Sequence, residues 1–223
     1  MSDVFTLHEL FKSPDIHQLG MSGQCGWPHD VDAPHPNLTE GLLVVEEGLE
    51  LRAPVEGDAE GLFLQIDANR NYLREWLPWL DDICSPEDEV SAIGRDAKMR
   101  GDGQSCMYLI FLDGEIVGVI GLNWIDWSNR GCGIGYWLSQ GHTGQGIVTR
   151  CCTRLMDYCF DDLGLHRLVL EAAAENFTSR AVAERLGMRL EGITKEREWL
   201  YDHFVDAALY AITAPEWRER NQD

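Results

Sequence analysis

A glycine-rich segment between a predicted strand and a long predicted helix carries the clearest chemistry in this sequence. The segment has the sequence GHTGQGI at residues 141–147 and follows an apolar run that ends at Leu138. Because glycine has no Cβ, successive backbone N–H groups can converge on one point, and the start of the following helix adds partial positive charge. Such a segment favours a phosphate or pyrophosphate group, although an ordinary strand-to-helix turn explains the glycines equally well.

The spacing of these glycines excludes two common phosphate motifs. No Lys-Ser or Lys-Thr pair follows Gly146, as a P-loop requires. Gly141, Gly144 and Gly146 also lack the spacing of the dinucleotide-binding fingerprint. The segment must therefore be interpreted together with the elements that position it.

The composition limits the classes of partner. Among 223 residues, 18 Lys and Arg oppose 38 Asp and Glu, which gives a formal net charge of −20. This charge disfavours nucleic acid as a partner, and no apolar run approaches the roughly 18 residues of a membrane span. The seven cysteines contain no Cys-x-x-Cys pair, and their odd number indicates free thiols in a cytoplasmic protein. The N-terminus does not resemble a secretory signal.

Hydrophobic periodicity predicts the elements around the glycine-rich segment. Strands are expected at 42–45 and 49–53 as an early hairpin, and at 106–112, 116–124, 134–138, 167–172, 191–198 and 207–212. Helices are expected at 58–68, 69–80, 85–100, 145–163 and 179–186. This order predicts an α/β (α+β) fold in which a mixed central β-sheet is flanked by helices.

Two short signals set boundaries within this order. Asp113 and Gly114 predict a tight two-residue turn between two strands. Ser85 followed by Pro86 predicts the start of a helix, because serine is a good N-cap and proline suits the first helical position.

Residues 1–41 differ in composition from the rest of the chain. They are rich in Gly and Pro and are predicted to form a loop-rich N-terminal extension, whereas residues 42–223 are predicted to form the domain. Within the extension, His29, Asp30, Asp32 and His35 are metal-type ligands that follow no defined spacing rule. No metal site is therefore expected.

Several further segments together resemble the GNAT-fold N-acetyltransferases, and more narrowly their RimJ/RimL branch. In chain order these segments are NRxxLxxWLPW at 69–79, GVIGLN at 118–123, GYWL at 135–138 with HTGQGI at 142–147, ENxxS at 175–179, ERLGMxLEG at 184–192 and DAALY at 206–210. One such motif is weakly specific, but several in the right order are strongly specific. The resemblance covers roughly residues 42–213 and implies the GNAT fold. It departs from the family pattern at Gly141, where Gln or Arg is usual, and at Met188, where Phe is usual.

The resemblance implies acetyl-CoA as cosubstrate and no metal. The glycine-rich loop would bind the pyrophosphate, Asn176 the pantetheine arm, and a backbone N–H near Trp137 and Leu138 the oxyanion of the tetrahedral intermediate. The cofactor-binding residues implied in this way are Tyr136, Trp137, Leu138, His142, Thr143, Gly144, Gln145, Gly146, Ile147, Asn176 and Ser179.

The resemblance also assigns two catalytic roles. The substrate amine arrives as an ammonium ion and must lose a proton before it attacks the thioester, and this role falls to Glu198. Ser179 would then supply a proton or hydrogen bond to the departing CoA thiolate. The alternatives are structural: Glu198 is a solvated carboxylate on a late strand, and Ser179 is the N-cap of a helix.

The acceptor is the least determined part of this interpretation. The resemblance implies that the acceptor is a primary amine, and the first hypothesis is the N-terminal α-amine of a ribosomal protein. It also implies that Trp76, Trp79 and Asn123 lie near the substrate. Core packing is the alternative role of the two tryptophans. A RimL-like detoxifying enzyme for a small amine, such as an aminoacyl-nucleotide or an antibiotic, is the second hypothesis, and a non-catalytic acetyl-CoA-binding regulator is the third. No nucleic acid or membrane partner is expected, and a homodimer stays as the alternative to a monomer.

Overall fold

The computed structural model describes residue 38 and residues 41–220. The chain divides into two units, Met1–His35 and Pro36–Asp223, and all described residues belong to the second. The expected extension, with its histidines and aspartates, therefore lies almost entirely outside the described residues.

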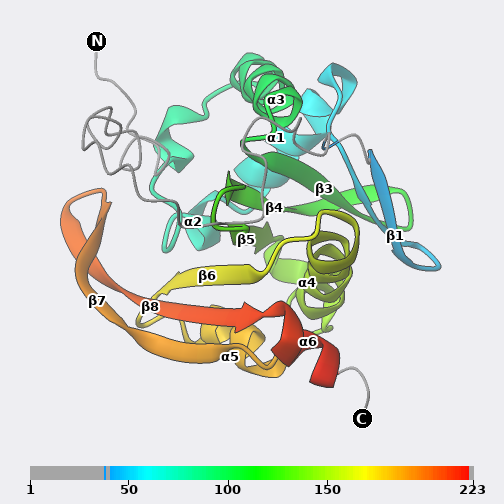
Figure 1. The fold of residues 1–223 in the computed structure, drawn as a ribbon. Coiled ribbons are helices and arrows are strands. Elements are labelled where there is room, and N and C mark those ends of the chain that lie inside the picture. The colour runs from blue at the N-terminus through cyan, green and yellow to red at the C-terminus, as the bar shows by residue number, and fades with distance from the viewer. Residues whose placement is uncertain (1–37, 39–40, 221–223) are drawn as a thin grey trace, which may run out of the picture. The chain divides into compact units, whose positions relative to one another are not determined.

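An eight-stranded sheet with the order β1-β2-β3-β4-β5-β6-β8-β7 forms the centre of this unit (Figure 1). Within the described chain, β5 and β6 pair in parallel and all other neighbours pair antiparallel, so the predicted mixed sheet is confirmed. The strands are β1 (Leu42–Glu46), β2 (Leu49–Arg52), β3 (Cys106–Leu112), β4 (Glu115–Asp126), β5 (Gly131–Leu138), β6 (Arg167–Ala173), β7 (Arg189–Leu200) and β8 (His203–Thr213).

Helices cover both faces of this sheet (Figure 1). They are α1 (Ala59–Ala68), α2 (Arg70–Leu73), α3 (Pro86–Gly101), α4 (Ile147–Asp157), α5 (Phe177–Arg185) and α6 (Ala214–Arg220), and a π-helical turn, Tyr158–Asp162, follows α4. On one face, Leu109 and Trp137 pack with Ile66 of α1. On the other face, Ile110 and Ile134 pack in the larger core cluster that includes α4 and α5. The predicted flanked sheet is thus the observed architecture.

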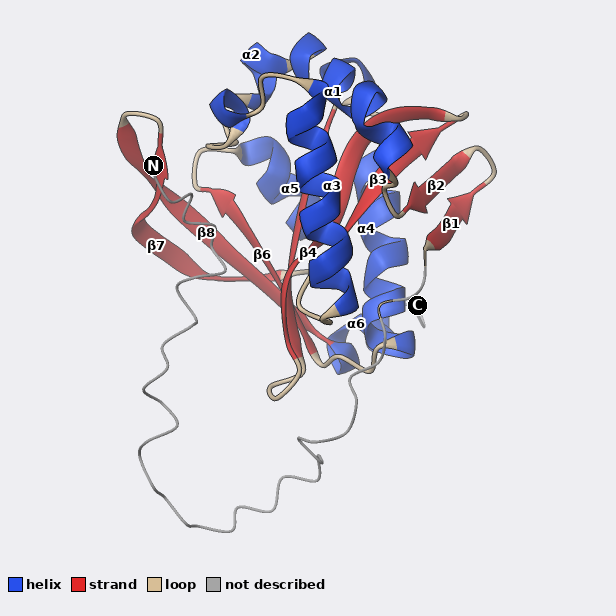
Figure 2. Cartoon of the chain, turned by 90° about the horizontal axis from the view of Figure 1, so that it is seen from above, coloured by secondary structure: helices blue, strands red, loops and turns tan. Residues whose placement is uncertain are grey.

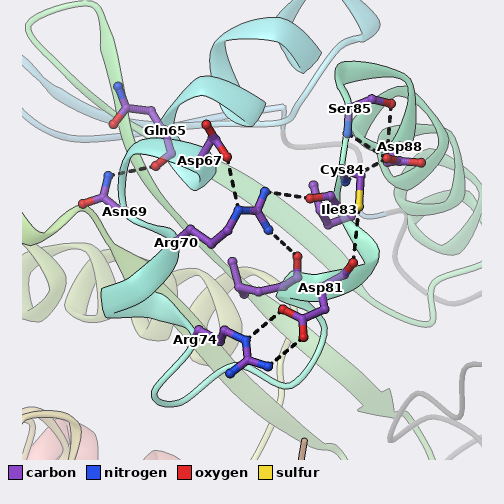
Figure 3. A network of polar contacts seen from close by, with 11 residues as sticks. Gln65, Asp67, Asn69, Arg70, Arg74, Asp81, Ile83, Cys84, Ser85 and Asp88 are labelled. Carbon is purple, nitrogen blue, oxygen red and sulfur yellow. Dashed lines mark hydrogen bonds and ion pairs between the residues drawn. The ribbon is translucent and has the colours of Figure 1, made fainter.

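The two local boundary signals are confirmed. Asp113 and Gly114 have φ values of +50° and +86°, which is the left-handed geometry of a tight hairpin turn between β3 and β4. Helix α3 begins at Pro86, and the carboxylate of Asp88 accepts hydrogen bonds of 2.9 Å from the backbone N–H groups of Cys84 and Ser85 (Figure 3).

The helix expected at 69–80 is wrong beyond Leu73. Helix α2 has four residues, after which the chain turns at 74–76 and continues irregularly to a short 3-10 helix, Leu80–Asp82. Pro78 cannot donate an intrahelical hydrogen bond, and its ring disfavours a helical conformation before it. The guanidinium of Arg70 donates to the carbonyl oxygens of Leu80 (2.6 Å) and Ile83 (2.7 Å), which stabilises the turn instead (Figure 3).

Candidate active site

Strands β5 and β6 separate halfway along their length. They pair from Gly131 opposite Arg167 to Ile134 opposite Leu170, and no pairing follows. Beyond that point residues 135–138 stay paired with β4, and residues 171–173 stay paired with β8. Figure 2 shows the two halves of the sheet converging at one end and diverging at the other. The divergence leaves an opening in the middle of the sheet.

The backbone of β5 presents an N–H group to this opening. The N–H of Ser139 donates to the carbonyl of Val117 at 2.8 Å, so this N–H points toward β4. Because successive residues of a strand direct their N–H groups to opposite sides, the N–H of Leu138 points away from β4, into the opening. Of the two residues expected to stabilise an oxyanion, Leu138 therefore has the suitable orientation, whereas the N–H of Trp137 faces β4.

The glycine-rich segment lies between the end of β5 and the start of α4. Gly144 and Gly146 have φ values of +76° and +72°, which glycine adopts without strain. Helix α4 begins at Ile147 rather than at 145, because the left-handed Gly146 is its N-cap. The N–H of Arg150 donates to the carbonyl of Gly146 at 3.1 Å, so the preceding N–H groups of the first turn have no intrahelical acceptor.

Side chains of the segment fold back onto it and leave space for a ligand. Thr143 Oγ1 donates to the carbonyl of Gln140 at 2.8 Å, and Gln145 Nε2 donates to that of Gly141 at 3.3 Å. A Cβ on Gly144 would meet no atom within 4 Å, so the space beside it is open. His142 is half-buried, and its buried Nδ1 forms no hydrogen bond with any described residue. Free N–H groups, an open approach and an unpaired ring nitrogen suit the pyrophosphate of a CoA molecule.

Helix α1 holds the start of this loop in place. Oδ1 of Asn69 accepts a hydrogen bond from the backbone N–H of Gln140 at 2.8 Å, and Ser139 Oγ donates to Gln65 Oε1 at 2.9 Å. The amide of Asn69 is itself oriented, because its Nδ2 donates to the carbonyl of Gln65 at 2.8 Å (Figure 3). Sequence reasoning marked Asn69 as part of a motif but missed this contact, which joins residues 71 positions apart.

Asn176 and Ser179 lie at the start of α5, on the far side of the opening from β5. The N-cap is Asn176, whose Oδ1 accepts a hydrogen bond from the N–H of Ser179 at 3.0 Å. The alternative role of Ser179 as N-cap is therefore wrong. Its hydroxyl oxygen lies 2.8 Å from the hydroxyl oxygen of Tyr136 on β5. Tyr136 and Trp137 lie on opposite faces of the sheet, as their alternation predicts.

Glu198 is a half-buried carboxylate on β7. Burial raises its pKa above the ordinary value, while Arg197 lowers it and Glu171 adds to the rise. Arg197 is engaged elsewhere, because it forms a two-pronged ion pair with Glu171 at 3.2 Å. No described residue donates a hydrogen bond to Glu198, and its raised pKa makes it a stronger base than an exposed carboxylate.

Glu198 and Ser179 lie on opposite faces of the sheet. Glu198 pairs with Val205 of β8, whereas Tyr210 of β8 has its hydroxyl in contact with Arg180 and Glu184 of α5. Because side chains alternate along a strand, Val205 and Glu198 face away from α5. A base on one face and a hydroxyl on the other can serve two different steps of acyl transfer, which are deprotonation of the amine and stabilisation of the leaving group.

The three expected acceptor-site residues occupy different settings. Trp76 and Trp79 are both half-buried in the turns after α2, and Trp79 packs against the core cluster of α1. They do not share a helical face, since the helix ends before them. Asn123 lies at an irregularity in β4 and presses against Gly135, where a Cβ would come within 2.6 Å of its Nδ2. Gly135 is thus required for close packing.

A pocket that sequence reasoning missed lies between the turn after α2 and the tip of the β7–β8 hairpin. It has a volume of about 360 Å³ and is lined by Arg74, Glu75, Leu200, Tyr201, Asp202 and His203. The Tyr201 hydroxyl donates to the carbonyl of Leu77, and the Arg74 guanidinium lies 3.7 Å from the centre of the Tyr201 ring. Arg74 also pairs with Asp81 through hydrogen bonds of 2.9 and 2.8 Å (Figure 3).

Two negative observations apply to the described residues. No helix among residues 41–220 is long and apolar enough to cross a membrane. In the same part of the chain, no three His, Cys, Asp or Glu side chains are grouped as a metal site would require.

A sheet that opens between two parallel strands, with a glycine-rich loop and a helix N-terminus beside the opening, defines an acyl-CoA-dependent transferase. The family model described as "Acetyltransferase (GNAT) domain" matches residues 48–189. The chain therefore belongs to the GNAT acetyltransferase family, and the resemblance stated from its motifs is confirmed.

Individual members of this family are similar to the chain over most of its length. The chain is 35% identical to the ribosomal-protein-serine acetyltransferase of Escherichia coli (strain K12), over 78% of this chain and 97% of that protein. A crystal structure of the microcin C7 self-immunity acetyltransferase MccE in complex with acetyl-CoA and AMP is similar, with a TM-score of 0.75 and 29% identity, over 79% of this chain and 98% of that one. The RimL ribosomal L7/L12 α-N-protein acetyltransferase in complex with coenzyme A has a TM-score of 0.75 and 31% identity, over 77% and 97% of the two chains.

Proposed function

We propose that this chain transfers the acetyl group of acetyl-CoA to the N-terminal α-amine of a protein, with ribosomal proteins as the acceptor class. The observation that carries the proposal is the opening between β5 and β6, which has the loop of residues 141–147 at one end and Glu198 across the sheet. Similarity to a ribosomal-protein-serine acetyltransferase, over 97% of that protein, supports this choice of acceptor. Such an acceptor is met in the cytoplasm.

The residues around the opening divide the binding of acetyl-CoA among them. The N–H groups at the start of α4 and the His142 ring would hold the pyrophosphate. Oδ1 of Asn176 is occupied by the N–H of Ser179, so its Nδ2 is the group left to bind the pantetheine arm. Trp137 and Leu138 line the β5 side, where the thioester carbonyl would lie near the Leu138 N–H.

The chemistry follows from this arrangement. Glu198 accepts a proton from the substrate ammonium ion, directly or through water, and the free amine attacks the thioester carbonyl. The N–H of Leu138 stabilises the oxyanion that develops. The C–S bond then breaks and releases the CoA thiolate, which the Ser179 hydroxyl stabilises by a hydrogen bond until the thiolate takes a proton from water. The amide nitrogen gives its second proton to water, because Glu198 already holds the first. Placing the amine and the thioester in contact supplies much of the acceleration.

The pocket at the hairpin tip gives an extended peptide a place to lie. Leu200 and His203 line it and share a sheet face with Glu198, because Leu200 is two residues along β7 and pairs with His203. Two residues of a strand span about 7 Å. A peptide whose amine meets Glu198 would therefore place its second and third residues beside Glu75 and Asp202.

A small amine such as an aminoacyl-nucleotide is the second candidate acceptor. The similarity to a self-immunity acetyltransferase solved with AMP supports it. The half-buried indole rings of Trp76 and Trp79 also suit a planar ligand, because aromatic rings stack on each other.

Acetyl-CoA-dependent thiol release separates the two candidates. The purified protein would be tested with Ser- and Ala-initiated peptides, aminoacyl-nucleotide mimics, aminoglycosides and polyamines. Release with the peptides alone supports the proposal, and release with the nucleotide mimics alone replaces it by detoxification. Binding of acetyl-CoA without release for any acceptor would contradict both.

A further inference from the structure

The side chain of Tyr136 reaches from β5 to the start of α5. It starts on β5, and its hydroxyl lies 2.8 Å from Ser179 Oγ and 3.3 Å from the Ser179 carbonyl oxygen. Ser179 belongs to α5, which follows β6, so this contact joins β5 to the helix after β6, beyond the point where the pairing of the two strands has ended. The ring is half-buried and packs against the larger core cluster.

The backbone of Ser179 is fixed, which leaves its hydroxyl as the variable group. Its N–H is held by Asn176 Oδ1 at 3.0 Å. Burial raises the pKa of the Tyr136 hydroxyl far above its ordinary value, so that this hydroxyl stays protonated and has one proton to donate. The shorter of its two contacts is to Ser179 Oγ. When Oγ accepts that proton, the proton of Ser179 must point to another acceptor.

We propose that Tyr136 is a positioning residue for acyl transfer, because its hydroxyl donates to Ser179 Oγ and so turns the Ser179 O–H toward the departing CoA sulfur. This goes beyond the cofactor contact that the family pattern implies for Tyr136, and it rests on the proposed site for acetyl-CoA. Tyr136 exchanges no proton with the substrate. Its hydrogen bond occupies one acceptor position of Ser179 Oγ and thereby determines the direction in which the Ser179 O–H points.

A second tyrosine, Tyr210 of β8, contacts the same helix, α5, and provides a matched control. The hydroxyl of Tyr210 accepts a hydrogen bond from Arg180 Nε at 3.1 Å and donates to Glu184 Oε1 at 3.0 Å. Tyr210 is buried and holds α5 to the sheet without contacting Ser179. Tyr210→Phe therefore removes a hydroxyl that supports α5, as Tyr136→Phe does, but leaves the proposed orientation of Ser179 intact.

The first experiment measures the ionisation of the CoA thiol in the bound state and needs no acceptor. The thiolate absorbance of CoA bound to the full chain is followed against pH, with the desulfo-CoA complex as reference. A serine proton directed at sulfur stabilises the thiolate. Tyr136→Phe and Ser179→Ala should each lower the acid dissociation constant of the bound thiol by about three- to tenfold, the value of one hydrogen bond. Tyr210→Phe should leave it unchanged.

The second experiment compares two acetyl donors in turnover with the best acceptor peptide. Tyr136→Phe should lower kcat by about three- to tenfold with acetyl-CoA and leave its KM within twofold. Acetyl-seleno-CoA has a far more acidic leaving group, which needs less stabilisation, so the defect should shrink with this donor. A role limited to packing would give the same defect with both donors. Circular dichroism and desulfo-CoA affinity establish that each variant is folded.

The outcomes separate this inference from the proposed function. An unchanged thiol titration in a folded Tyr136→Phe variant overturns the inference, whatever the acceptor. A shifted titration in a protein that acetylates nothing on the panel supports the inference and contradicts the proposed function. If Tyr136→Phe does not bind CoA, then Ser179→Ala decides, because an unshifted thiol in that variant also overturns the inference.

Discussion

Oδ1 of Asn69 accepts a hydrogen bond from the backbone N–H of Gln140 at 2.8 Å, and this bond joins the end of α1 to the start of the glycine-rich loop. The loop therefore depends on an element far away in the sequence. The Asn-Arg motif has two parts in this structure: Asn69 holds the loop, and Arg70 holds the turn that carries Trp76 and Trp79.

Asn69→Ala should weaken acetyl-CoA binding. The variant leaves the Gln140 N–H without its acceptor and frees the start of the loop, which costs about 1 kcal/mol, or about fivefold in Kd. Isothermal titration with acetyl-CoA measures the change. Asn71→Ala is the matched control, because Asn71 is exposed and lies only two residues further along the chain. Equal affinities for the two variants would contradict a role of Asn69 in the loop.

Gly144→Val should also weaken acetyl-CoA binding, by about tenfold. A β-branched residue at a φ of +76° is strained by roughly 1–2 kcal/mol, and its side chain would occupy the space beside the loop. Gly57→Val is a control at an exposed glycine without a left-handed φ. Unchanged affinity in Gly144→Val would show that the phosphates bind elsewhere.

The acid limb of the pH–rate profile should depend on Glu198 and Glu171. Glu198 acts as a base when ionised, so kcat/KM should fall as pH falls through its raised pKa. Burial is the main cause of that rise, and Glu171 adds to it. Glu171→Gln should therefore move the acid limb to lower pH, because it removes a like charge and releases Arg197. A limb that stays in place, or moves to higher pH, would exclude this electrostatic coupling.

Glu89 should make stability depend on pH. This carboxyl is buried in α3, and burial raises its pKa to about 7. A carboxyl whose pKa is raised by folding contributes stability at low pH, and this stability is lost as pH rises through about 7. Glu89→Gln should therefore raise Tm above pH 7 and have little effect near pH 4. Thermal unfolding across this range measures the difference, and Glu87→Gln on the exposed side of the same turn is the control.

The sequence predicted those structural features that a few neighbouring residues determine. Asp113-Gly114 and Ser85-Pro86 fix a turn and a helix start within a few residues, so their outcome needed no knowledge of the rest of the chain. The end of α2 at Leu73 has a local cause and a distant one. Pro78 disfavours a longer helix, and the turn that replaces it depends on bonds from Arg70 to carbonyls 10 and 13 residues away, which periodicity does not reveal.

The candidate site was predictable where motifs carry it and hidden where tertiary contacts build it. The glycine spacing and the family resemblance pointed to the loop, to Ser179 and to Glu198. The contacts of Asn69 with Gln140 and of Tyr136 with Ser179 join residues 71 and 43 positions apart. The pocket likewise requires the hairpin tip to meet the turn after α2, and no pattern in either segment indicates that meeting.

The most direct test of the central claim is mass spectrometry of a Ser-initiated peptide after incubation with acetyl-CoA and either the wild-type protein or Glu198→Gln. The account predicts one acetyl group on the α-nitrogen with the wild type. It predicts a rate lower by about a hundredfold or more with the variant, whose acetyl-CoA affinity should stay within twofold. Acetylation on a lysine side chain, or equal rates for the two proteins, would contradict it.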